Sequence, residues 1–153
     1  MVLCKGVIIM AEFTSNAVQT VAAGQNVLLT ETAVPCNKGY VIHREGAGIV
    51  TLRGIVNNPC CGFARYKVSF GGNVAIPADG TVDSISIALA LDGEPIPTSS
   101  AIVTPAAVDE YWNVYASLYI TVPKGCCYTI AIENTSTQPI NIQNTNLIVE
   151  RTA

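Results

Sequence analysis

The sequence predicts an all-β domain, a sandwich of about ten short antiparallel strands arranged in two sheets. Apolar and polar residues alternate over short segments, turn residues interrupt them every roughly 8–14 residues, and no long segment has helical periodicity. Regular alternation broken by turns is typical of β-sandwiches. The chain of 153 residues is long enough for one such domain with a sizeable core.

Residues that favour turns separate the expected strands. Glycine supplies positive φ, proline fixes φ, and Asn or Asp binds its own backbone. On these grounds Gly71-Gly72 is interpreted as a turn between two strands, and residues 108–112 as one helical turn at most. We expect strands at residues 17–22, 26–34, 40–43, 48–56, 64–70, 73–76, 82–91, 101–103, 111–122, 127–134 and 139–150.

The strand pattern places the domain at residues 17–153, preceded by an N-terminal segment at 1–16. Met10-Ala11-Glu12 has the form of an ordinary bacterial start. Lys5-Gly6-Val7 can be encoded by a purine-rich ribosome-binding sequence upstream of it. Residues 1–9 are therefore interpreted either as a translated leader or as part of the natural chain. The nucleotide sequence would distinguish the two.

The composition is poor in charge. Hydrophobic residues make up 50% of the chain and charged residues 12%, against about 25% charged in a typical domain. A monomer of this composition exposes apolar patches, so we expect self-association. The eight Lys and Arg are scattered and the net charge is −3, which argues against nucleic acid as a partner. No apolar stretch approaches the roughly 20 residues of a spanning helix, so membrane insertion is not expected.

The expected strand at 111–122 has two distinct faces. The face that we expect in the core carries Trp112, Val114, Ala116, Leu118, Ile120 and Val122. The other carries Tyr111, Tyr115 and Tyr119 among small polar residues. Tyrosine is a good strand former, so this face fits an exposed sheet surface. It also fits an oligomer interface, where tyrosine is enriched, and the low charge favours that interpretation.

The order of segments in the second half resembles a known family. The long strand is followed by Pro123-Lys124-Gly125, a strand ending in Glu-Asn-Thr-Ser at 133–136, and a closing Leu-Ile-Val-Glu-Arg at 147–151. This pattern resembles the trimeric jelly-roll heads of the tumour-necrosis-factor and complement-globular-head type, with their bacterial and phage relatives. The resemblance implies a jelly-roll sandwich. It also implies a homotrimer with Tyr115 and Tyr119 near the threefold axis.

Catalytic motifs are poorly represented. The single histidine, His43, lies in a short apolar strand, and there is no Gly-x-Ser-x-Gly elbow. Asp79-Gly80 and Asp92-Gly93 are explained as turns, and no loop has the alternating oxygen ligands of a calcium site. We therefore interpret His43 as structural and expect neither an enzyme nor a cofactor.

The cysteines are the most specific feature. Besides Cys4 and Cys36 there are two adjacent pairs, Cys60-Cys61 and Cys126-Cys127, which lack the two-residue spacing of zinc ligands. A jelly roll would place the loops with these pairs at one end. They are interpreted as small buried hydrophobes, as one or two disulfides between the loops, or as a metal site. A start at Met10 leaves five cysteines, hence a free thiol or an intersubunit bond.

These observations favour a structural protein. The leading hypothesis is a homotrimeric phage virion component, a capsid decoration or head-fibre protein, made in the bacterial cytoplasm and located on the virion surface. Its partners would be itself, capsid or other virion surface proteins, and a host surface glycan. The alternative is a glycan- or receptor-binding head on the surface of a bacterium or spore, with its site at the connection 101–111.

Overall fold

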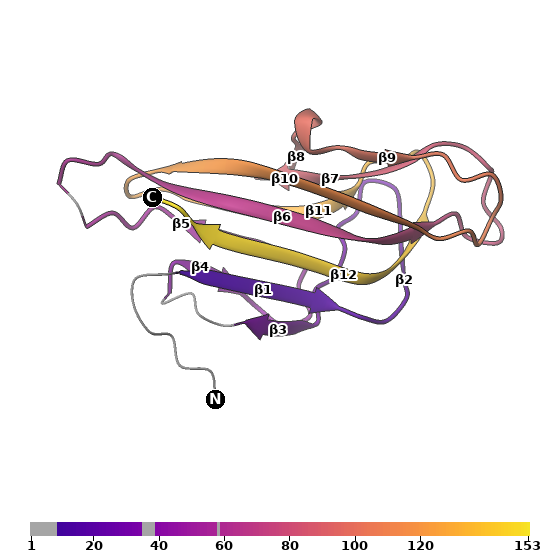
Figure 1. Cartoon of the computed structure of the whole chain (residues 1–153), viewed down its shortest axis with the longest axis horizontal. Helices are drawn as coiled ribbons and strands as arrows, with labels where there is room; N and C mark the ends of the chain where they lie inside the picture. Colours follow the sequence, from indigo (N-terminus) through magenta and orange to yellow (C-terminus); the bar gives the residue numbers. More distant parts are fainter. Residues whose placement is uncertain (1–8, 35–38, 58) are drawn as a thin grey trace.

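The computed structural model describes residues 9–34, 39–57 and 59–153, and its described residues form a β-sandwich (Figure 1). The strands are β1 (Met10–Ser15), β2 (Gln19–Val21), β3 (Glu31–Val34), β4 (Val41–His43), β5 (Val50–Arg53), β6 (Phe63–Ala75), β7 (Ile85–Leu91), β8 (Glu94–Pro95), β9 (Ala101–Val103), β10 (Trp112–Pro123), β11 (Cys127–Asn134) and β12 (Ile140–Arg151). One 3₁₀ turn, η1 (Pro97–Ser99), lies between β8 and β9. Within these residues, no helix is long and apolar enough to cross a membrane.

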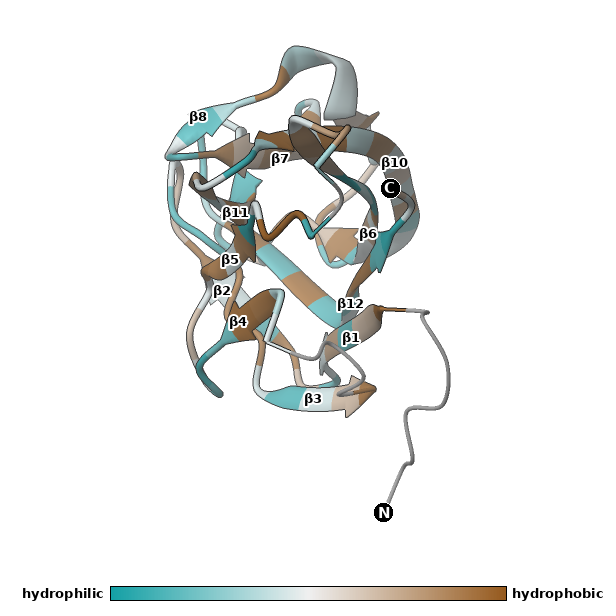
Figure 2. Cartoon of the chain, turned by 90° about the vertical axis from the view of Figure 1, so that its left-hand side faces the viewer, coloured by the Kyte–Doolittle hydropathy of each residue, from teal (hydrophilic) through white to brown (hydrophobic). Residues whose placement is uncertain are grey.

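Two antiparallel six-stranded sheets make up the sandwich. The first has the order β10-β6-β12-β1-β3, with β2 also pairing with β12. The second has the order β4-β5-β11-β7-β8, with β9 also pairing with β7. Seen along the long axis, the sheets face each other across the interior (Figure 2). The predicted all-β sandwich of two antiparallel sheets is confirmed.

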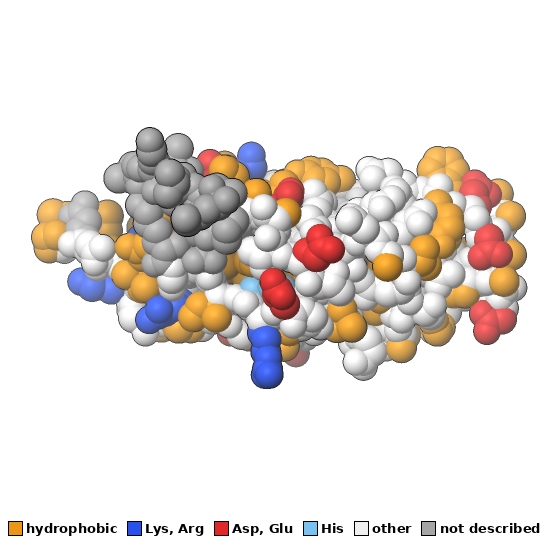
Figure 3. All heavy atoms as spheres, turned by 90° about the horizontal axis from the view of Figure 1, so that it is seen from below, with side chains coloured by type: hydrophobic (Ala, Val, Ile, Leu, Met, Phe, Trp, Pro, Cys, Tyr) orange, Lys and Arg blue, Asp and Glu red, His pale blue; other side chains and the backbone are white. Residues whose placement is uncertain are grey.

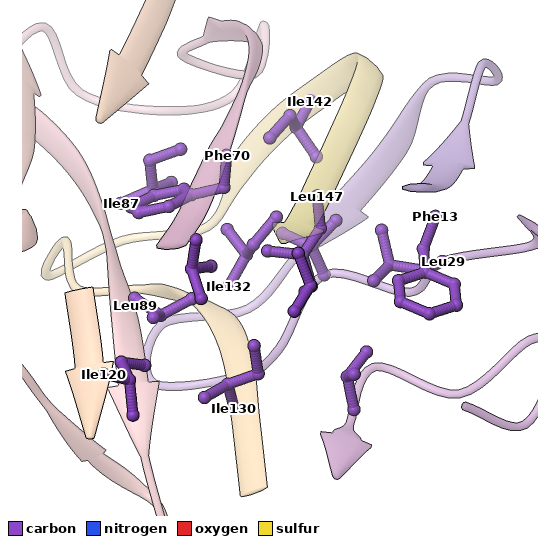
Figure 4. Close-up of a cluster of buried hydrophobic side chains, with 14 of the residues drawn as sticks. Phe13, Leu29, Phe70, Ile87, Leu89, Ile120, Ile130, Ile132, Ile142 and Leu147 are labelled. Carbon is purple, nitrogen blue, oxygen red and sulfur yellow. The ribbon is translucent and has the colours of Figure 1, made fainter. Parts of the chain in front are cut away.

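The core lies between the sheets because each strand turns its apolar positions inward. The side chains of Ile87 and Leu89 on β7 face that of Phe70 on β6 across the interior (Figure 4). The labelled side chains in that view are Phe13, Leu29, Phe70, Ile87, Leu89, Ile120, Ile130, Ile132, Ile142 and Leu147, all of them buried. Burial of each large side chain contributes about 1.5–3 kcal/mol, so this layer supplies the main stabilisation of the fold.

The sandwich begins before residue 17, contrary to the predicted boundary. Residues 10–15 form β1, which pairs with β12 from Met10 opposite Glu150 to Ser15 opposite Thr145. Ala11, Phe13 and Ser15 are buried on its inner side. The alternation is present in the sequence, but only Phe13 is large and apolar there. The N-terminal segment proper is thus shorter than predicted.

The predicted turn at Gly71-Gly72 is wrong. Both glycines lie inside the continuous 13-residue strand β6. A Cβ on Gly71 would lie 2.4 Å from the Val114 carbonyl oxygen and 3.0 Å from Cδ2 of Tyr115. A Cβ on Gly72 would lie 3.2 Å from the side chains of Ile142 and Thr145. These glycines therefore make room for neighbours rather than reversing the chain.

One further expectation needs correction. Of the expected strand at 26–34, only β3 is a strand, and Asn26 forms a single bridge with Glu133. Residues 108–112, expected to form one helical turn at most, contain a non-helical turn with Asp109 at positive φ that leads into β10. The 3₁₀ turn lies instead at η1, where Pro97 supplies the first position.

Candidate functional site

Two tyrosines stand on the outer face of the first sheet, as the alternation predicts. Tyr115 and Tyr119 of β10 are 58% and 62% exposed, while Val114, Ile120 and Val122 of the same strand are buried. Between the tyrosines, Ser117 Oγ lies 3.1 Å from Ser69 Oγ of β6. We call this outer surface, formed by β10, β6, β12 and β1, the tyrosine face.

The glycine opposite Tyr115 shapes the tyrosine face. Tyr115 pairs with Gly71 in the β10–β6 register, and its ring lies close above that glycine. An aromatic ring over a strand glycine covers backbone that no side chain of its own protects. Tyr115 is thereby held against the sheet rather than projecting freely.

The row through Tyr119 carries the charges of this face. Tyr119 lies opposite Lys67 of β6, which lies opposite Glu150 of β12, which in turn pairs with Met10 of β1. Opposite charges at directly paired positions stabilise neighbouring strands. A shallow hollow of about 360 Å³ adjoins this row, lined by Arg65, Tyr119 and Thr121. The face therefore combines aromatic area, one matched charge pair and a concavity.

Strand β10 is also the last strand of its sheet. It pairs with β6 over all 12 of its residues and, among the described residues, no strand pairs with its other edge. An unpaired edge of this length is open to another molecule. The open edge and the tyrosine face thus adjoin along the same strand.

Two aromatic residues near the start of β10 lie away from the core. Tyr111, predicted on the interface, precedes β10 and is 38% exposed. Trp112, predicted in the core, is 47% exposed, and its Nε1–H donates to Oε1 of Glu110 at 2.9 Å. The prediction for Trp112 is wrong because the strand begins beyond the edge of the apolar layer. Alternation alone does not show where a strand extends past the edge of the apolar core.

The two cysteine pairs lie at one end of the sandwich, which we call the thiol end (Cys60, Cys61, Cys126 and Cys127). Pro123 at the end of β10 pairs with Phe63 at the start of β6, so the loop before β6 and the turn after β10 are neighbours. The backbone confirms this, since the Gly54 N–H donates to the Cys126 carbonyl at 2.8 Å and the Lys124 N–H to the Gly62 carbonyl at 2.9 Å.

The thiols at this end are mostly exposed. Cys60, Cys126 and Cys127 are exposed and Cys61 is half-buried, so their interpretation as small buried hydrophobes is wrong. Cys126 and Cys127 carry free thiols in this structure. Across the described residues no three His, Cys, Asp or Glu side chains gather as a metal site. Cys4 and Cys36 lie outside the described residues.

Basic side chains surround the thiol end, a feature that the sequence did not reveal. Cys127 pairs with Arg53 of β5, and Lys124 shares the turn of Cys126. Arg65 lies two residues into β6 and stacks on Phe63, with its Cζ 4.8 Å from the ring centroid. Arg65 follows Cys61 by four residues and Lys124 precedes Cys126 by two, but the two loops meet only because β6 pairs with β10 and β5 with β11.

Below this end, Tyr66 ties the sheets together. It is buried, and its hydroxyl donates to the Arg53 carbonyl oxygen at 2.6 Å. Burial raises the pKa of Tyr66, while the nearby Arg151 opposes this rise. The hydroxyl therefore stays protonated and serves as a structural donor.

His43 takes part in packing. Its ring centroid lies 4.6 Å from that of Phe13, and its Nε2 lies 3.0 Å from the Ala47 carbonyl oxygen. Its Nδ1 is buried and has no partner among the described residues. No nucleophile or carboxylate is hydrogen-bonded to this ring within the same residues. This placement gives His43 a structural role.

A shallow hollow on the second sheet is a second candidate. It has a volume of about 230 Å³ and is lined by Gly24, Pro95 and residues 133–136. Burial, followed by repulsion from Glu94, raises the pKa of the Glu133 carboxyl. The single carboxylate and the open shape provide no acid–base pair, so this hollow is a weaker candidate than the tyrosine face.

Comparison with known proteins supports the fold. No model of a known family matches the chain, and no curated protein matches it. Among solved structures it is similar to Eiger TNF from S. frugiperda, with a TM-score of 0.67 at 13% identity over 95% of this chain and 93% of that one. It is also similar to murine APRIL (0.64, 10%, 95% and 100%) and to the globular domain of a zebrafish complement 1qA protein (0.57, 12%, 94% and 95%). At these identities the likeness shows the fold, which is the predicted jelly-roll sandwich.

Proposed function

We propose that this chain is a homotrimeric structural head whose copies meet through the tyrosine face. The carrying observation is the pair Tyr115 and Tyr119, 58% and 62% exposed beside an unpaired strand edge. Burying a large aromatic side chain contributes about 1.5–3 kcal/mol, and tyrosine is enriched in interfaces. The order of three comes from the resemblance to trimeric jelly-roll heads.

The surface on which this head sits is proposed to be that of a phage virion, where it acts as a capsid decoration or head-fibre component. Two features support this. The charged fraction is low, as befits a protein that buries much of its surface in an assembly. The described residues present no catalytic set.

A second candidate function is recognition of a glycan or receptor on a bacterial or spore surface. Trp112 favours it, because the indole is 47% exposed and hydrogen-bonded to the carboxylate of Glu110. An exposed aromatic ring beside a carboxylate provides an apolar surface and a polar anchor for a sugar ring. Loss of glycan-array binding in Trp112→Ala would support this candidate over a purely structural role.

The interface is tested by introducing charge at its centre. In the double variant Tyr115→Glu and Tyr119→Glu, we expect sedimentation to report monomers, because buried unpaired carboxylates oppose association. The matched control is Ile42→Glu, which places one carboxylate at a 50% exposed apolar position on the second sheet. Both variants should keep the far-UV spectrum of a β protein. A double variant that sediments like the unmodified chain would contradict the proposed interface.

A further inference from the structure

The thiols of Cys126 and Cys127 are placed so that they do not bond to each other. Cys127 is the first residue of β11 and Cys126 precedes it in the turn. Consecutive residues entering a strand direct their side chains to opposite faces, and diverging Cβ vectors preclude a disulfide. Both residues are exposed and carry free thiols. They are therefore available to a group outside this chain.

The loops at the thiol end are held together without a covalent bond. Besides the two hydrogen bonds already described, the Gly125 N–H donates to the Gly54 carbonyl at 2.9 Å. Gly54 fits so closely that a Cβ there would lie 2.1 Å from the Pro123 carbonyl oxygen. Close packing and backbone hydrogen bonds fix the turn that carries Cys126, so its thiol has no structural role left to fill.

Asp and Glu side chains do not neutralise the positive charge around these thiols among the described residues. Arg53 donates to the Gly39 carbonyl and Arg65 to the Thr121 hydroxyl, while Lys124 lies exposed in the turn. Among the described residues none of these three side chains is hydrogen-bonded to an Asp or Glu carboxylate, although the backbone N–H of Arg65 donates to the terminal oxygen of Ala153 at 3.0 Å. Elsewhere, Glu150 lies opposite Lys67 in the β12–β6 register, Asp92 accepts from Thr129, and the C-terminal residue also accepts from Arg151.

The far end of the sandwich has the opposite charge. Asp79 and Asp83 lie in the loop after β6, and Asp109 and Glu110 lie just before β10. Viewed from below, one tip of the long axis shows red side chains without blue, and the other shows blue without red (Figure 3). A field of this polarity draws acidic groups toward the thiol end and repels basic ones.

From these observations we propose that the thiol end is a disulfide-exchange attachment site for an acidic, cysteine-bearing segment of a partner protein. The partner's cysteine arrives as a disulfide with a small thiol. The thiolate of Cys126 or Cys127 attacks that disulfide, a new S–S bond forms to the partner, and the small thiol leaves as its thiolate with the bonding electron pair. No further oxidant is consumed. A second copy of this chain is disfavoured as the partner because its thiol end carries the same positive charge.

This site is independent of the proposed trimer contact. The tyrosine face joins copies through apolar area, whereas the thiol end would join the head to whatever carries it. The two are tested by different readouts, because native mass reports the trimer and a covalent adduct reports the thiol end. Failure of one therefore leaves the other standing.

The experiment compares two peptides, each with one cysteine activated as a mixed disulfide with thionitrobenzoate. In one peptide the cysteine is flanked by glutamates, and in the other by lysines. Release of coloured thionitrobenzoate from the pre-reduced full chain gives the exchange rate, and peptide mapping locates the adduct. We expect the acidic peptide to react about tenfold faster at low ionic strength, and the two rates to converge near about 1 M salt.

Variants identify the residues responsible. Lys124→Glu should reduce the preference for the acidic peptide, whereas Arg44→Glu, which changes an exposed arginine on the β4–β5 connection, should leave it unchanged. Cys126→Ser with Cys127→Ser should remove the fast adduct, while Cys60→Ser with Cys61→Ser should retain it. Equal rates for both peptides at low salt, or a fast adduct mapped elsewhere, would overturn the proposal.

Discussion

The two sheets differ in how the outer edges of β7 and β10 are hydrogen-bonded. At the edge of the second sheet, β7 pairs with β8 and β9, and between them the Ile96 N–H donates to the Leu89 carbonyl at 2.9 Å. The Leu89 N–H in turn donates to Oγ of the buried Ser99 at 2.9 Å. At the edge of the first sheet, β10 has no pairing strand on its outer side among the described residues.

The chain's own residues complete the hydrogen bonding along the β7 edge, but they do not do so along the β10 edge. Residues 94–103 cover the β7 edge with two short strands and a 3₁₀ turn, so that edge is satisfied internally. No strand pairs with the outer edge of β10 among the described residues, although η1 and β9 lie close to part of that strand, and exposed tyrosines adjoin it. Natural proteins usually protect long edges with covering segments, charges or bulges. The unpaired edge and the tyrosine face are therefore where we propose that other copies bind.

Gly71→Ala should disrupt the packing of β10 against β6, and we expect it to destabilise the protein more than any other substitution considered below. The added Cβ meets the Val114 carbonyl at 2.4 Å, so β10 must move away from β6 or the tyrosine ring must lift. We expect a loss of about 3 kcal/mol in the free energy of unfolding, measured by urea titration at fixed protein concentration.

The control for Gly71→Ala is Gly62→Ala. An added Cβ at Gly62 meets nothing within 4 Å, and that residue does not have positive φ. It should therefore leave stability unchanged or raise it slightly. Unfolding of both variants at the same urea concentration would contradict the close approach of β10 to Gly71.

Ser99→Ala should weaken the closed edge by a smaller amount. It leaves the Leu89 N–H buried without its acceptor, which costs about 2 kcal/mol and lowers the thermal midpoint. The neighbouring exposed serine serves as control, because Ser100→Ala should change stability by less than about 0.5 kcal/mol. A midpoint in Ser99→Ala as high as that of Ser100→Ala would show that η1 does not hold this edge.

The fold was largely predictable because alternation is a local property of the sequence. Segments such as 85–91 and 127–134 alternate clearly, and the structure places their Ile and Leu residues in the core. Glycine was less informative. Gly71 is needed for a close approach by Tyr115, and a single sequence does not separate that role from a turn. Strand β1 was missed because only Phe13 marks its inner face.

The candidate sites were only partly predictable. The period of two in 111–122 correctly placed Tyr115 and Tyr119 on one surface and away from the core. It failed at Trp112, since alternation continues past the end of the apolar layer. The open edge of β10 depends on sheet order, and the basic surroundings of Cys126 depend on which loops meet. Both are long-range properties that no local pattern carries.

The central claim is that the tyrosine face and the open edge of β10 are covered by other copies of the chain. Light scattering of the unmodified protein at micromolar concentration tests it most directly. We expect a mass three times the 16.1 kDa of one chain. A mass of 16.1 kDa at that concentration would contradict it.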